Sequence, residues 1–199
     1  MHKLPTATCM PSAAPALIQR VPALGLGARI EREIASILAR PRETAGMLRD
    51  IDDMRERLYA SRPARSHFDL KLARGGLVDI DFILQAAILE AAPAFALGSV
   101  SSQLPALEAL ESVGAINAQD AQMLARAYTV FESVNQTARA AAGGLFSPAA
   151  AGADLSAAVA RAAGAGDIAG AERVLAELRA GVEEIFERRV RAPARASPA

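Results

Sequence analysis

Apolar residues recur every three or four positions along most of this 199-residue chain, which places them on one face of an α-helix. The clearest stripes lie within Met47–Leu58, Met123–Val134 and Val174–Phe186. The pattern predicts helices over residues 28–40, 43–60, 77–92, 104–113, 118–142 and 155–163, and a last helix that follows Asp167. Six to seven helices joined by short loops predict an all-α fold, a helical bundle.

Polar side chains mark the beginnings of two of these helices. Asn117 and Asp167 each precede an apolar stripe, and their side chains can accept a hydrogen bond from the free N–H groups of the first turn. The two ends of the chain lack helical periodicity and are rich in Pro, Ala and Ser. We therefore expect a disordered leader at residues 1–15, a helical domain at 16–190 and a disordered tail at 191–199.

Composition narrows the class of protein. Hydrophobic residues make up 52% of the chain and aromatic residues only 4%, so the predicted core consists mainly of Ala, Leu, Ile and Val. The formal net charge is zero, which gives no basic footprint for nucleic acid. No apolar run reaches the ~20 residues of a membrane-spanning helix, and Cys9 is the single cysteine. We expect a cytoplasmic protein with neither a nucleic-acid nor a membrane partner.

The segment from Phe68 to Gln85 carries the most chemical information. It begins with a piece that we expect to be extended, His67–Lys71, and later contains Asp79 and Asp81. On a strand these two carboxylates would share one face, as in the Asp-x-Asp metal sites of nucleotidyltransferases. On a helix they would point about 200° apart and could not bind one ion together. The apolar stripe that continues past Gln85 favours the helix, so no metal site is predicted.

A second functional interpretation is compatible with a helix. Gly75 and Gly76 would let the backbone approach a ligand closely, and the helix that follows would offer unpaired N–H groups and a positive dipole end. Lys71 and Arg74 add positive charge nearby. Together these residues could contact a triphosphate held by a neighbouring domain. The alternative is that the glycine pair only turns the chain and that both cations are solvated.

Other arrangements of reactive side chains are weaker. His67 is the only histidine beyond the leader, and no group of His, Cys, Asp and Glu has zinc-ligand spacing. The sequence also contains no convincing Ser-His-Asp triad and no phosphate-binding P-loop motif. The carboxylates Asp50, Asp52, Asp53 and Glu56 are interpreted as a solvated helix face. The residues alone therefore predict a helical module with no catalytic residue and no cofactor of its own.

The glycine-containing segment resembles a known family. The stretches Phe68–Lys71 (Phe-Asp-Leu-Lys) and Gly75–Gln85 (Gly-Gly-Leu-Val-Asp-Ile-Asp-Phe-Ile-Leu-Gln) closely resemble the sequence that follows the nucleotidyltransferase core in bifunctional glutamine synthetase adenylyltransferase/adenylyl-removing enzymes. A related Gly-Gly motif occurs in PII uridylyltransferases. The resemblance covers roughly residues 16–190 and includes Asp53–Arg57 and Val182–Arg188.

This resemblance implies a function. In that family each half has a nucleotidyltransferase core followed by a helical bundle; one half attaches AMP to a tyrosine of glutamine synthetase and the other removes it. It implies Mg and ATP as cofactors of the complete enzyme, and glutamine synthetase and the PII signalling protein as partners. The Val78-Asp79 form of the motif is more similar to the second, adenylylating half.

Two departures from the family pattern affect the expectation. No Gly-Ser followed by paired Asp residues, which hold the metal in the family core, precedes residue 16, and Asp81 stands where Glu is common. The chain is therefore expected to be a helical, regulatory or substrate-docking part that is inactive alone and works with a nucleotidyltransferase core if the enzyme is split. The alternative is a stand-alone helical interaction module without catalysis.

Overall fold

The computed structural model describes residues 25–93, 102–142 and 145–196, which form an all-α bundle with no strand in that part of the chain. The helices are α1 (Leu26–Leu38), α2 (Thr44–Ser61), α3 (Leu77–Ala91), α4 (Gln103–Ser112), α5 (Ala118–Ala142), α6 (Ala153–Ala162), α7 (Ile168–Phe186), a π-helical segment (Glu187–Arg191) and α8 (Ala192–Ala196). The seven predicted helices are present, which confirms the all-α fold. The predicted leader lies outside the described residues.

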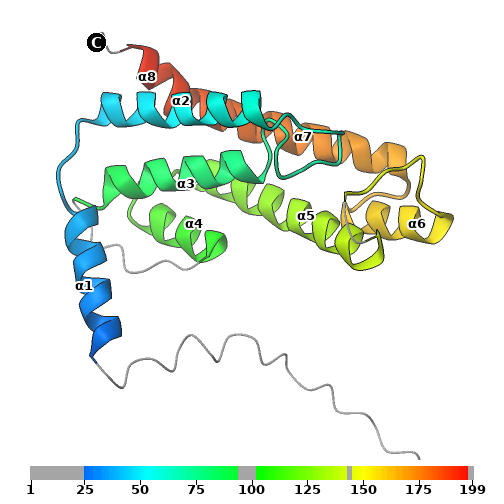
Figure 1. Ribbon diagram of the computed structural model, residues 1–199, viewed down its shortest axis with the longest axis horizontal. Helices are drawn as coiled ribbons and strands as arrows, with labels where there is room; N and C mark the ends of the chain where they lie inside the picture. The colour runs from blue at the N-terminus through cyan, green and yellow to red at the C-terminus, as the bar shows by residue number, and fades with distance from the viewer. Residues whose placement is uncertain (1–24, 94–101, 143–144, 197–199) are drawn as a thin grey trace, which may run out of the picture.

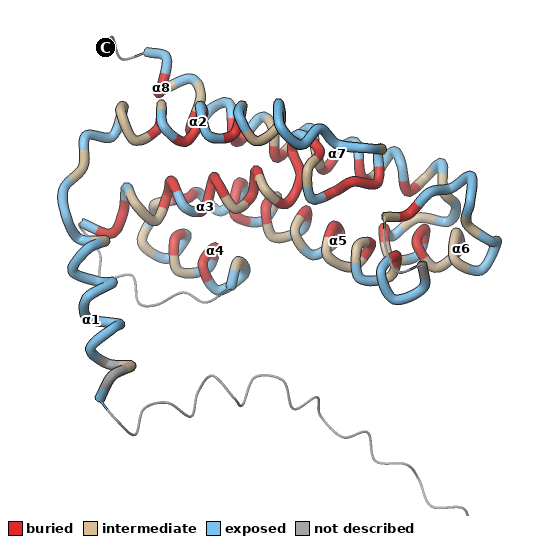
Figure 2. The backbone as a smooth tube through the Cα atoms, viewed as in Figure 1, coloured by how far each residue is buried: buried red, intermediate tan, exposed pale blue. Residues whose placement is uncertain are grey.

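Helix α3 lies at the centre of the bundle and contacts α2, α4, α5 and α7 (Figure 1). Ile80 and Ile83 are fully buried, and burial extends around most of the helix (Figure 2). A helix that is apolar on nearly every side belongs in a core, which explains the long apolar run in this segment. None of the described helices combines the length and the continuous hydrophobicity needed to cross a membrane.

The local signals for helix starts are confirmed. The Asn117 side-chain oxygen accepts a hydrogen bond from the Asp120 N–H at 2.9 Å, and the Asp167 carboxylate accepts one from the Gly170 N–H at 2.7 Å. The expectation of an extended piece at His67–Lys71 is wrong. These residues form successive turns because local backbone hydrogen bonds close them, such as the bond from the Ala73 N–H to the Asp69 carbonyl at 2.8 Å.

The expected disordered tail is wrong for residues 191–196, which continue the last helix. Proline normally breaks a helix because it lacks an N–H, but Pro193 is the second residue of α8, directly after the end of the π segment at Ala192. The Ala192 N–H donates to the Glu187 carbonyl five residues earlier. Helix α8 packs on α2, and Ala194 is buried. Tertiary packing therefore overrides a composition that is typical of disorder.

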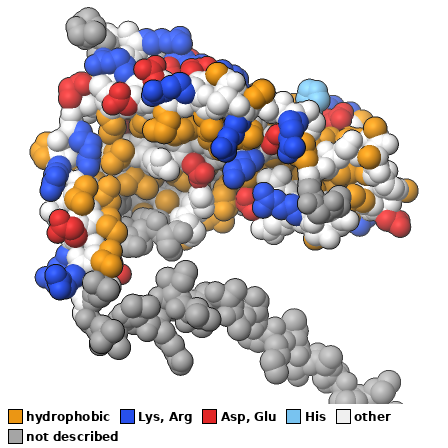
Figure 3. Space-filling view, in the orientation of Figure 1, with side chains coloured by type: hydrophobic (Ala, Val, Ile, Leu, Met, Phe, Trp, Pro, Cys, Tyr) orange, Lys and Arg blue, Asp and Glu red, His pale blue; other side chains and the backbone are white. Residues whose placement is uncertain are grey.

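Helix α1 projects away from the rest of the bundle (Figure 1). The predicted helical face is present, but Ile30, Ile34 and Ile37 remain 50%, 44% and 44% exposed. In the space-filling view, apolar side chains gather along α1 and on the neighbouring face of the bundle (Figure 3). Within the described part of the chain, this apolar face of α1 is not part of the core.

Candidate functional site

Gly75 and Gly76 lie where the turn that precedes α3 packs closely against α7. We call this contact the glycine joint. Gly75 adopts a φ of 72°, in the left-handed region that favours glycine. A side chain at Gly75 would overlap the backbone carbonyl of Arg179 in α7, and one at Gly76 would overlap the carbonyl oxygen of Leu70. The Arg179 side chain in turn donates a hydrogen bond to the Arg74 carbonyl at 3.0 Å. The two glycines are therefore needed for close packing against α7 and for the turn into α3.

Asp79, in the first turn of α3, is the acceptor at the centre of this joint. Its side chain is fully buried and accepts hydrogen bonds from Arg55 Nε at 2.6 Å and Nη2 at 2.5 Å. The Tyr59 hydroxyl and the Gly75 N–H each donate to the same carboxylate at 2.6 Å. Four donors from α2 and the glycine turn thus converge on one buried carboxylate, and each of its two oxygens accepts two of these hydrogen bonds.

Arg55 is the cation of this cluster and is as fully buried as Asp79. Its guanidinium also forms an ion pair with Glu183 of α7 and stacks on the Phe186 ring, 3.9 Å from the ring centre. Burial would lower the pKa of Arg55, but the hydrogen bond and charge of Asp79 and the charge of Glu183 raise it above its ordinary value. Burial and the negative charge of Asp79 also raise the pKa of Tyr59. We call Arg55, Tyr59, Asp79 and Glu183 the buried charge cluster.

The buried charge cluster corrects the prediction for α2. Asp52, which is predicted to lie on a solvated helix face, is buried, and so is Arg55 three positions later. Met54, within the predicted apolar stripe Met47–Leu58, is instead 52% exposed. Asp52 accepts a hydrogen bond from Arg191 Nε at 3.0 Å, and Arg191 also pairs with Glu56. The sequence contains an indication of this burial. Positions 48, 51, 52 and 55 share one helical face, and the first two are the apolar residues Leu48 and Ile51.

Asp79 and Asp81 do not form a pair. Both lie on α3, as the helical interpretation predicted, and Asp81 accepts a hydrogen bond from the Gln103 side chain of α4 at 3.0 Å. Asp79 is committed to Arg55. Within the described ranges, no group of His, Cys, Asp and Glu has the arrangement of a metal site.

The two predicted phosphate-contacting cations have different surroundings. Arg74 forms a two-bonded ion pair with Glu56, at 2.9 and 2.7 Å, and this pair is about half exposed. Lys71 is exposed, and its carbonyl accepts a hydrogen bond from the Val78 N–H at 3.3 Å. The Leu77 N–H likewise donates to a loop carbonyl, so these amides at the start of α3 already have partners. These contacts favour the packing joint, and phosphate binding at the start of α3 stays a prediction.

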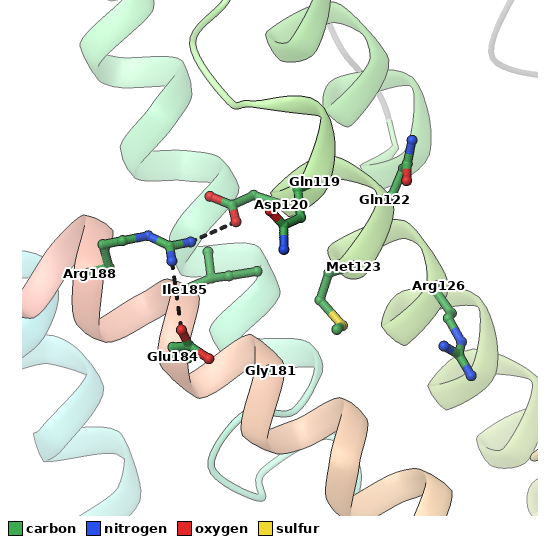
Figure 4. A pocket seen from close by; sticks show the side chains of 9 residues that line it. All are labelled: Gln119, Asp120, Gln122, Met123, Arg126, Gly181, Glu184, Ile185 and Arg188. Carbon is green, nitrogen blue, oxygen red and sulfur yellow. Dashed lines mark hydrogen bonds and ion pairs between the residues drawn. The ribbon is translucent and has the colours of Figure 1, made fainter.

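A half-open cavity of about 310 Å³ lies between α5 and α7 (Figure 4). Asp120 at its edge is buried and pairs with Arg188 at 2.6 Å, and Arg188 also lies 3.9 Å from Glu184. Met123 reaches toward Gly181, where a side chain would come within about 3.0 Å of the Met123 sulfur. Most charges at this cavity are paired with one another, and the pair between Asp120 and Arg188 connects α5 with the segment that follows α7.

The described residues thus define an all-α domain whose glycine joint and buried charge cluster connect α2, α3 and α7. The family model described as GlnD PII-uridylyltransferase matches residues 45–188, which include the whole cluster. The chain belongs to this family, and the resemblance to glutamine synthetase adenylyltransferases is confirmed.

Three curated relatives carry the name bifunctional glutamine synthetase adenylyltransferase/adenylyl-removing enzyme. The chain is 36% identical over 160 residues to the protein of Bradyrhizobium sp. strain BTAi1 and 34% identical over 160 residues to that of Rhodopseudomonas palustris strain BisB5. It is 35% identical over 159 residues to that of Rhizobium meliloti strain 1021. These matches cover 79% or 80% of the chain but only 16% of each relative. No solved structure matches the chain.

Proposed function

We propose that this chain is the helical domain that works beside a nucleotidyltransferase core in a glutamine synthetase adenylyltransferase, which transfers AMP from ATP to a tyrosine of glutamine synthetase. The family match over residues 45–188 carries the proposal. The names of the curated relatives support the substrate. The proposed partners are glutamine synthetase, the PII signalling protein and the core, and the proposed location is the cytoplasm.

The chemistry of the domain's carboxylates supports a positioning role rather than a catalytic one. Nucleotidyl transfer needs metal-held phosphates and an in-line nucleophile. The Asp79 carboxylate accepts hydrogen bonds from Arg55, Tyr59 and Gly75, so a metal would have to displace those donors. We therefore propose that Mg and ATP are held by the core, and that this domain contributes to docking and regulation.

The test replaces the matched segment of the Bradyrhizobium relative with residues 45–188 of this chain. The chimera should adenylylate glutamine synthetase with labelled ATP and magnesium, whereas the relative with the segment deleted should not. The 199-residue chain alone should leave glutamine synthetase unlabelled. Full activity after deletion would refute a supporting role, and labelling by the chain alone would place catalysis in this domain.

A second candidate function is a stand-alone interaction module without catalysis. The exposed isoleucine face of α1 favours it, because Ile30, Ile34 and Ile37 offer an apolar stripe of the kind that helices use to dock. A chimera that is folded but inactive, together with a chain that binds neither glutamine synthetase nor PII, would favour this second function.

A further inference from the structure

A second cavity, of about 390 Å³, lies on the other side of the glycine segment, where residues 65–72 cross the C-terminal part of α5. Three cations line it: Arg65 and Lys71 from the turn segment and Arg139 from α5. The volume falls within the range of about 300–1,000 Å³ that is typical of small-molecule sites. This cavity is separate from the buried charge cluster and from the cavity between α5 and α7.

The charges around this cavity are only partly compensated. Asp69 is the single carboxylate in the lining, and it accepts a hydrogen bond from the Arg65 N–H at 3.2 Å and lies 3.8 Å from the Arg65 guanidinium. Lys71 and Arg139 are exposed and have no ion-pair partner within the described part of the chain. Three cations and one carboxylate leave a formal charge of plus two at the cavity.

The other side of the cavity is apolar. Phe146 is buried and packs edge-on against Phe68, with 4.8 Å between the ring centres. Leu72 and Leu145 are half-buried beside it, and Asn135 offers an amide. An apolar wall with a few polar groups is typical of sites that bind organic molecules rather than bare ions.

We propose that this cavity binds a small organic phosphate, with the phosphate group between Lys71 and Arg139 and the organic part on the wall formed by Leu72, Leu145 and Phe146. A phosphate ester carries about −1.5 to −2 charges at neutral pH, which matches the formal charge of the cavity, whereas a carboxylate carries only one. The guanidinium fork of Arg139 suits phosphate oxygens, and Lys71 adds a mobile point charge.

The competing explanation concerns helix stability alone. Arg139 lies in the last turn of α5, where a cation stabilises the carbonyl end of a helix. Lys71 would then simply be solvated. The two explanations differ in ligand binding, which is measured on the chain itself and does not depend on adenylyl transfer.

The test is isothermal titration of the full chain at low ionic strength with phenyl phosphate, inorganic phosphate and benzoate. Phenyl phosphate should bind with a stoichiometry of one, and more tightly than inorganic phosphate or benzoate. The K71Q/R139Q variant should weaken binding at least tenfold. The control is R173Q, which neutralises an exposed cation on α7 and should change binding less than twofold.

Three results would overturn the proposal. The first is no saturable binding of phenyl phosphate at millimolar concentrations. The second is an equal loss of binding in R173Q, which would indicate non-specific attraction. The third is benzoate binding as tightly as phenyl phosphate, which would indicate a carboxylate site. The far-UV circular dichroism of K71Q/R139Q should match that of the wild type, which shows that the variant is folded. Replacing Arg139 by Lys instead of Gln keeps the charge and should restore part of the affinity.

Discussion

Replacing Asp79 by Ala should destabilise the domain strongly, because it would leave the buried Arg55 without its main partner. Removing one member of a buried ion pair costs about 3–5 kcal/mol, since the remaining charge stays desolvated. Glu183 also pairs with Arg55 and would compensate part of that charge, which places the expected loss near the lower end, about 3 kcal/mol. A domain of this size loses roughly 2–4 °C in melting temperature per kcal/mol, so the expected shift is roughly 6–12 °C.

The measurement is chemical denaturation of the full chain followed by far-UV circular dichroism, in a double-mutant cycle with Arg55→Met. Because the two side chains share hydrogen bonds, the double variant should lose less stability than the sum of the single variants, by about 1–3 kcal/mol. The control is Arg74→Ala, which breaks the half-exposed pair with Glu56 and should cost no more than about 1 kcal/mol. Additive effects, or a loss below about 1 kcal/mol for Asp79→Ala, would refute the reasoning.

Three further predictions concern the glycine joint, the surface ion pair and the C-terminal helix. Gly75→Ala should cost about 2–4 kcal/mol in thermal melts because its side chain would overlap the α7 backbone, whereas Gly114→Ala, with a φ of 72° but open space, should cost only about 1–2 kcal/mol. The hydrogen bond from Arg74 lowers the pKa of Glu56 in the folded state. Glu56 should therefore stabilise the fold above its unfolded pKa of about 4.3 and lose that effect as the pH falls through its folded pKa. The loss of melting temperature in Glu56→Gln at neutral pH should accordingly vanish in melts at acid pH. Ending the chain after Val190 should lower the free energy of unfolding in urea by about 2 kcal/mol, because the loss of Arg191 leaves the buried Asp52 without its hydrogen-bond donor. An unchanged urea midpoint would contradict this.

The helices could be predicted because their signals are local. Asn117 and Asp167 bond to amides three residues away, and the apolar stripe of α7 is visible within its own sequence. The glycine pair also predicts a point where the backbone comes close to another group. What it approaches, the carbonyl of Arg179, lies about a hundred residues further along the chain and has no trace in the local pattern.

The buried charge cluster was missed for a similar reason. Sequence patterns assign charged residues to solvent, since burying an unpaired charge is costly. Arg55 is an exception only because Asp79 and Glu183, from two other helices, reach it in three dimensions. Composition predicts a disordered tail at residues 191–199, but residues 191–196 pack on α2, which is equally distant in sequence. Local patterns thus predicted the elements of this domain, whereas the contacts that position the candidate site depend on tertiary structure.

The ion pair between Arg55 and Glu183 also bears on how the domain forms during synthesis. The two residues are 128 positions apart, so a ribosome must translate nearly the whole bundle after α2 before Glu183 and the Phe186 ring exist. Asp79 is made much earlier and can neutralise Arg55 in the meantime. The contact between Arg55 and Asp79 can therefore form before α7 has been synthesised, whereas the contacts that cover the guanidinium from α7 form last.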